Sequence, residues 1–172
     1  MINLEEIKEY FGKECKTFPK LNKTDAKLSV TSKEILYEIG LPTYSGYGGD
    51  YIMLDELQLL EKRYLKFATR DFDEEYYSRC IDLKTDTVVF NLSYDGNKEY
   101  HFLNSDLESY LRYVYIYIKY MEEIETPEKL GNYHENYSKY AKELKERLLT
   151  INQDVNQGSW ADLIEEMDLG VI

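Results

Sequence analysis

Residues 87–104 read TVVFNLSYDGNKEYHFLN, and this stretch decides the class of fold. Apolar and polar side chains alternate along its first half, which is typical of a β-strand. The dipeptide Asp95-Gly96 stands between two such runs and is a strong signal for a tight hairpin turn. The stretch therefore predicts two consecutive antiparallel strands. The side chains expected to share the apolar face of the first strand are Val88, Phe90 and Leu92.

Three further runs of strand character precede this hairpin, at residues 51–56, 63–69 and 76–83. They are rich in β-branched and aromatic residues, which favour strands. Helical periodicity is found on both sides of the strands, at residues 3–12, 32–40, 105–125, 128–150 and 160–170. Segregated helices and strands with short turns predict an α+β fold. Its central antiparallel β-sheet is expected to be a meander flanked by N-terminal and C-terminal helices, and we expect a single domain over residues 1–172.

The ends of the predicted helices carry capping signals. Side-chain oxygens that accept hydrogen bonds from the first N–H groups favour helix starts. We expect this role for Asn3, Ser32, Ser105 and Ser159. Glycine favours helix ends because it adopts positive φ without strain. We expect this role for Gly12, Gly40 and Gly170. Pro42 follows Gly40 and cannot continue a helix, so these two residues predict a corner.

The balance of charge indicates a kind of partner. The chain has 33 acidic residues against 21 lysines and arginines, a net charge of -12. Nucleic acid is a poor partner for such a surface, because phosphates bind cations. A basic protein fits better, since opposite charge speeds encounter. Plain solubility explains the same charge equally well. Tyrosine is also abundant, with 18 copies, and suits both half-buried positions and protein interfaces.

The sequence predicts a cytoplasmic protein. It has no run of about 18 apolar residues that would cross a membrane, and its amphipathic, acidic start MINLEEIKEYFG is unlike a signal peptide. Cys15 and Cys80 lie far apart, and we expect two free thiols.

The glycine-rich residues 38–52, EIGLPTYSGYGGDYI, raise the question of phosphate binding. A Walker loop needs a Lys after its last glycine, and a dinucleotide loop leads from a strand into a helix. Here no Lys follows, and the chain runs from a predicted helix into a predicted strand. The stretch therefore predicts a corner, and we expect no cofactor.

Catalytic and metal-binding patterns are also missing from the sequence. Ser45 has Thr43 two places before it, so the nucleophile-elbow pattern G-x-S-x-G fails. The two histidines, His101 and His134, stand among apolar or aromatic neighbours and are expected to be structural or on the surface rather than catalytic. No C-x-x-C or H-E-x-x-H pattern occurs, so we expect no metal.

Two features are candidates for contact with a partner. The first is the turn DFDEE, which fails the EF-hand pattern because Tyr76 stands where glycine is needed. It is either a solvated acidic turn or a patch for basic side chains. The second is a row of tyrosines on the helix at 105–125, which is either a second buried face or an exposed aromatic face. The candidate contacts are Asp71, Asp73, Glu74, Glu75, Tyr113, Tyr117, Tyr120, Glu122 and Glu123.

Four pieces of the chain together resemble the SUKH superfamily of bacterial immunity proteins, nearest to its fourth subgroup. They are EILYEIGLPTY, CIDLKTDTVVF, FLNSDLESYL and SWADLIEEMDLGVI, and their order and spacing cover roughly residues 32–172. Gly40, Pro42 and Trp160 belong to these pieces. The resemblance implies an α+β domain without shared catalytic residues. It also implies a role in binding and neutralising a cognate bacterial toxin, often a nuclease.

Three hypotheses follow. The first is an immunity protein that binds a basic toxin through charge and aromatic anchors. The second is a small hydrolase with paired carboxylates, which should show acids with raised pKa converging in one place. The third is a regulatory scaffold protein of the same fold.

Overall fold

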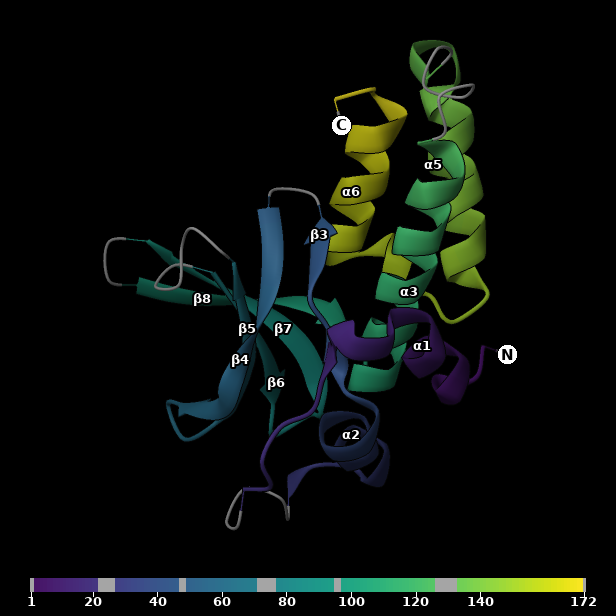
Figure 1. Cartoon of the computed structure of the whole chain (residues 1–172). Helices are drawn as coiled ribbons and strands as arrows, with labels where there is room; N and C mark the ends of the chain where they lie inside the picture. The colour runs from purple at the N-terminus through teal and green to yellow at the C-terminus, as the bar shows by residue number, and fades with distance from the viewer. Residues whose placement is uncertain are drawn as a thin grey trace. The chain divides into compact units, whose positions relative to one another are not determined.

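The structure is a computed structural model that describes residues 2–21, 27–46, 49–70, 77–94, 97–125 and 133–171. The chain groups into two compact units, residues 1–110 and residues 111–172. We call the first the sheet unit and the second the helical unit. Helices precede and follow a run of antiparallel strands along the chain, so the predicted α+β class is confirmed (Figure 1). The single domain over residues 1–172 stays a prediction.

Among the described residues, six strands form one antiparallel sheet in which each strand pairs with the next. They are β3 (Tyr44–Gly46), β4 (Gly49–Leu60), β5 (Tyr64–Arg70), β6 (Tyr77–Asp82), β7 (Thr87–Tyr94) and β8 (Asn97–Asn104). The predicted meander is therefore confirmed. Strands β7 and β8 close against each other with Tyr94 opposite Asn97, and the predicted turn residues Asp95 and Gly96 lie outside the described residues. The glycine-rich stretch forms the hairpin β3–β4, with Gly46 opposite Gly49.

The sheet buries side chains on both faces. Val88 is buried as predicted, but Val89, Asn91 and Ser93 on the opposite face are buried too, which alternation did not predict. On that face the rings of Tyr64 and Tyr100 stack with centroids 3.5 Å apart, packed against Cys80 and Val89. Tyr64 is on β5 and Tyr100 on β8, and three strand spacings amount to about 14 Å in a flat sheet. The ring contact therefore indicates a curved sheet with a concave face.

The N-terminal elements belong to the sheet unit. They are α1 (Leu4–Phe11), η1 (Gly12–Glu14), β1 (Cys15–Lys16), α2 (Val30–Glu34), η3 (Ile35–Ile39) and β2 (Leu41–Pro42). Asn3 caps α1 as predicted, because its Oδ1 accepts a hydrogen bond from the N–H of Glu5. The cap of α2 is Ser29, not Ser32, whose own N–H donates to the Ser29 Oγ at 3.0 Å.

Gly40 and Pro42 form the predicted corner. The N–H of Gly40 donates to the carbonyl of Ile35 at 2.7 Å and ends the helical segment. The next residues turn into β2, which pairs with β1 so that Pro42 lies opposite Cys15. Gly40 has φ +92°, and a Cβ at this position would lie 3.0 Å from the carbonyl carbon of Lys16. The corner therefore requires glycine for two reasons, its dihedral angle and the close approach of β1.

The C-terminal helices are α3 (Leu107–Ile124), α5 (Tyr133–Leu149) and α6 (Gly158–Asp168), with the short turn η4 (Asp154–Asn156) between the last two. Helix α3 begins in the sheet unit and continues in the helical unit. Its cap is Asp106 rather than Ser105, since the Asp106 Oδ1 accepts from the N–H of Ser109 at 2.6 Å. Helix α6 begins at Gly158, so Ser159 lies inside it and does not cap it.

Candidate interaction surface

The structure tests part of the predicted contact set. Asp71, Asp73, Glu74 and Glu75 lie outside the described residues, so the acidic turn stays a prediction. The predicted tyrosines and glutamates of α3 are described. The tyrosines are buried, whereas the glutamates are exposed.

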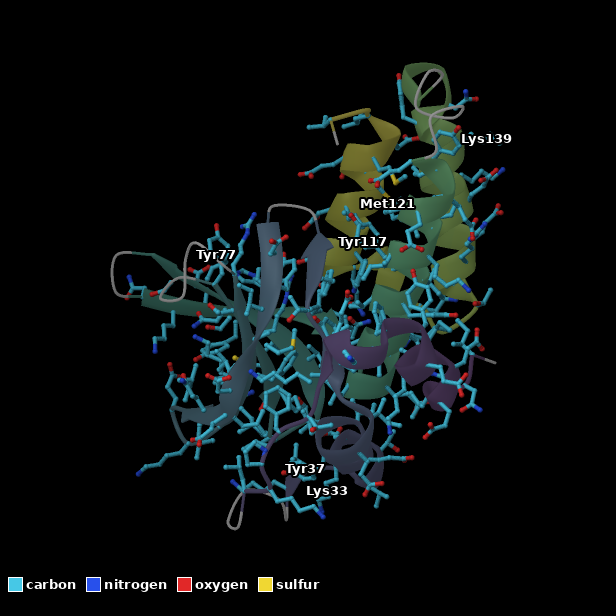
Figure 2. The ribbon with its side chains drawn as sticks, viewed as in Figure 1. Lys33, Tyr37, Tyr77, Tyr117, Met121 and Lys139 are labelled. Carbon is cyan, nitrogen blue, oxygen red and sulfur yellow. The ribbon has the colours of Figure 1, made fainter. Side chains whose placement is uncertain are left out.

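The tyrosine row on α3 is buried. Tyr113, Tyr117 and Tyr120 are 0%, 9% and 1% exposed. Tyr113 and Tyr117 present their rings edge-on to buried Trp160 of α6, with centroids 5.1 and 6.2 Å apart. Figure 2 shows Tyr117 on the side of α3 that faces α6. The exposed aromatic face was therefore wrong and the second buried face is confirmed, because Tyr113 and Tyr117 pack against α6 and Tyr120 packs against α5.

The hydroxyls of Tyr113 and Tyr120 form hydrogen bonds inside the helical unit. The Tyr113 hydroxyl donates to Asn152 Oδ1 at 2.8 Å and accepts from the N–H of Val155 at 3.0 Å. The Tyr120 hydroxyl donates to Glu143 Oε2 at 3.0 Å. Burial raises the pKa of Tyr113 to about 12, so its hydroxyl keeps its proton. These hydroxyl hydrogen bonds explain why tyrosine rather than phenylalanine occupies positions 113 and 120.

Glu122 and Glu123 are exposed, in the last turn of α3. Glu123 forms a two-point ion pair with Arg147 of α5, with nitrogen–oxygen distances of 3.0 and 2.7 Å. The same guanidinium lies over the ring of Tyr120, 4.6 Å from its centroid. Glu123 therefore has an internal role and carries a charge that is already partly compensated, whereas sequence reasoning treated both glutamates alike.

A second group of acids lies at the end of α6. Tyr113 and Tyr117 of α3 contact Trp160 in the first turn of α6. Figure 1 shows that α3 and α6 run in the same direction within the helical unit. Their C-terminal ends therefore lie at the same end of the helical unit. We call the following residues the acidic helix ends: Glu122, Glu123, Glu125, Glu165, Glu166 and Asp168.

These acids stand at the unfavourable pole of each helix. The C-terminal end of a helix carries partial negative charge, and an acid there costs about 0.3–1 kcal/mol at a surface. Neither α3 nor α6 has a basic residue in its last turn. Among the described groups, Arg147 pairs with Glu123, and the Ser138 hydroxyl donates to Asp168 Oδ1. Sequence reasoning missed Glu165 and Asp168. The run WADLIEEMDLG contains acids but no basic residue, and it could have indicated them.

Two carboxyl groups of the sheet unit are held in the ionised state. A hydrogen bond and ion pair with Lys16 at 2.6 Å lower the pKa of Asp55. A two-point ion pair with Arg63 lowers the pKa of Asp82. A lowered pKa keeps a carboxyl group negatively charged. Such a group suits the binding of a cation and does not suit the donation of a proton in acid catalysis.

The described residues contain no group of three or more His, Cys, Asp and Glu side chains placed to hold a metal ion. His101 stacks on Phe90 at 5.0 Å and lies 3.5 Å from Glu99, which agrees with a structural role. The side chains of Ser45 and His134 lie outside the described residues.

In the described residues, these observations define an α+β protein with a six-stranded antiparallel meander, three helices that follow it, and acids at a shared end of two of these helices. Comparison with models of protein families, with curated proteins and with solved structures finds no match. No helix in the described ranges is long and apolar enough to cross a membrane.

Proposed function

We propose that this chain is a cytoplasmic immunity protein of the SUKH type. In this proposal it binds a basic domain of a cognate bacterial toxin and blocks it without catalysis. The observation that carries the proposal is the placement of the acidic helix ends, where two helices carry acids at the same end of the helical unit, each at the helix pole that disfavours negative charge. Residues that destabilise a protein locally, as these acids do, often serve its function.

Charge complementarity supports a basic partner. Lysines and arginines of a partner would relieve both the repulsion among these acids and their unfavourable interaction with the helix dipoles. The whole chain adds to this attraction with its net charge of -12, which would speed association at low salt. Nuclease domains have basic surfaces because they bind phosphates, so a nuclease-type toxin fits these requirements.

Two carboxyl groups of the sheet unit lack the raised pKa that acid catalysis needs. Asp55 and Asp82 are each paired with a cation, and the pKa of each is lowered. A glycosidase-type acid would need a raised pKa. The hydrolase and the regulatory scaffold remain alternative proposals without an observation of their own here.

The test uses the C-terminal domain of a toxin encoded beside this chain. Association is followed by stopped-flow fluorescence over a range of salt concentrations. We expect the double variant Glu122→Gln/Glu165→Gln to associate more slowly, and its rate to depend less on salt, because two steering charges are lost. The matched control is Glu9→Gln/Glu34→Gln, which removes two exposed acids of the sheet unit.

A second readout separates binding from folding. Because acids at helix C-terminal ends are unfavourable, the variant Glu122→Gln/Glu165→Gln should be more stable to urea by about 0.5–2 kcal/mol while it binds more slowly. If both double variants associate at the wild-type rate, the acidic helix ends are not the contact surface. If the toxin kills cells equally with and without the wild-type chain, the immunity function itself is wrong.

A further inference from the structure

Arg79 is a buried cation in the middle of the sheet. It lies on β6, with Ala68 opposite it on β5 and Phe90 opposite it on β7. Its side chain is 8% exposed, although arginine is almost never this buried without a counter-charge. Sequence reasoning gave it no role, because one arginine in a strand carries no motif.

Two aromatic rings cover the guanidinium. Its central carbon lies 4.3 Å from the ring centroid of Tyr51 and 5.4 Å from that of Phe90. Tyr51 comes from β4 and Phe90 from β7, which lie on opposite sides of β6 in the sheet order. The guanidinium therefore has aromatic neighbours from strands on both sides of β6.

Two further buried phenols, Tyr44 and Tyr110, are neighbours of this guanidinium. Tyr44 and Tyr110 are 8% and 1% exposed, and their hydroxyl oxygens are 3.5 Å apart. Tyr44 also stacks on Tyr51 with centroids 5.0 Å apart. Burial raises the pKa of both Tyr44 and Tyr110, so at neutral pH they are uncharged hydroxyls and do not neutralise the arginine.

The charge of Arg79 has no acidic partner in the described part of the chain. The groups that most affect its pKa besides burial are the phenols Tyr51, Tyr44 and Tyr110, and no carboxylate is among them. The Tyr51 hydroxyl accepts a hydrogen bond from the guanidinium, but the Nε atom has no acceptor. A buried charge without a counter-ion is costly, and cation–π contacts offset only part of that cost. Arg79 therefore keeps a buried N–H donor without an acceptor among the described residues.

We propose that Arg79, Tyr44, Tyr51 and Tyr110 bind a small free carboxylate. A carboxylate is planar and takes two parallel hydrogen bonds from a guanidinium edge, so it fits a guanidinium among aromatic rings better than a tetrahedral phosphate. The strong burial of Arg79, Tyr44 and Tyr110 favours a small acid over a side chain carried on a partner's backbone. This site lies in the sheet unit and is independent of the acidic helix ends.

The test is binding of 13C-labelled acetate, followed by NMR line broadening, together with the melting temperature of the full chain. We expect saturable broadening, and a melting temperature that rises with acetate but not with chloride at equal ionic strength. Phosphate is the comparison anion, and it should bind more weakly than acetate. Phosphate binding as tight as acetate, or no saturable response to either, would overturn the proposal.

Variants separate a binding site from a structural arginine. Arg79→Met should lose the acetate response while its melting temperature in chloride stays equal or rises, because a buried charge is replaced by an apolar chain. The matched control Lys98→Met removes an exposed cation of β8 and should keep the response. Should Arg79→Met fail to fold, Tyr44→Phe removes one hydroxyl and should weaken acetate binding several-fold. An acetate response that persists in Arg79→Met, or an acetate affinity that is unchanged in Tyr44→Phe, contradicts the assignment.

Discussion

Replacing Gly40 with alanine is the sharpest test of the fold. This glycine ends η3 and leads the chain into β2, directly against the backbone of β1. Its dihedral angles are φ 92° and ψ 165°, a region that residues with a Cβ rarely adopt. The added Cβ would lie 3.0 Å from the carbonyl carbon of Lys16 and 3.1 Å from that of Cys15. Both are backbone atoms, which cannot turn aside as a side chain can.

The expected loss combines two costs. Holding alanine in this backbone region costs about 1–3 kcal/mol. Forcing a methyl group into closely packed backbone costs about 1–3 kcal/mol more. We therefore expect Gly40→Ala to lower the free energy of unfolding by about 4 kcal/mol. For a chain of this size, that loss lowers the melting temperature by roughly 8–16 °C.

Gly12→Ala is the matched control. Gly12 also has positive φ, at +54°, but a Cβ there would meet nothing within 4 Å. Gly12→Ala should therefore lower the free energy of unfolding only by the strain of the backbone conformation, about 1–3 kcal/mol. Urea denaturation followed by tryptophan and tyrosine fluorescence measures both variants. Equal losses in the two variants would refute the close approach of β1 to Gly40.

Three further substitutions test particular contacts. Tyr113→Phe should cost about 1–3 kcal/mol in urea denaturation, because it leaves the buried N–H of Val155 without its acceptor, and a neutral result would contradict that bond. Asp106→Ala should cost about 1 kcal/mol by loss of the α3 cap, and Ser105→Ala should cost less; the reverse order would favour Ser105 as the cap. The pKa of Asp82 is lower in the folded chain than in the unfolded chain, so its contribution to stability is present above the unfolded value and is lost as pH falls through the folded value. Asp82→Asn should therefore flatten the acid side of the urea midpoint plotted against pH, and an unchanged slope would argue against its ion pair.

Local signals predicted much of the fold. Alternation and turn chemistry identified β7 and β8, and Asn3 and Gly40 cap or end their helices where the sequence placed them. The errors at Ser32 and Ser105 are shifts of one to three residues between neighbouring oxygen-bearing side chains. Such shifts occur because several residues near a helix start can accept the same hydrogen bonds, and backbone geometry chooses among them.

The candidate site was harder to predict than the fold. A row of tyrosines at helical spacing has the same pattern whether it faces solvent or another helix, and Trp160 packing on Tyr113 decided the outcome. Glu122 and Glu123 look identical in sequence, yet Arg147, 24 positions beyond Glu123, pairs with that residue. The alternation along β7 pointed to one buried face, but the curved sheet buries Asn91 on the other face as well.

The sequence by itself determined the order of helices and strands, the antiparallel pairing of consecutive strands, and the overall acidity. These properties depend on periods of 2 and 3.6 residues, on turn residues and on a count of charges, all of which act over short distances along the chain. The tertiary structure alone decided that the α3 tyrosines are buried and that the acids of α3 and α6 share one end. It also decided that Arg79 of β6 sits among rings from β4 and β7. Those outcomes depend on contacts between residues that are distant in the sequence, because packing and electrostatics act through space.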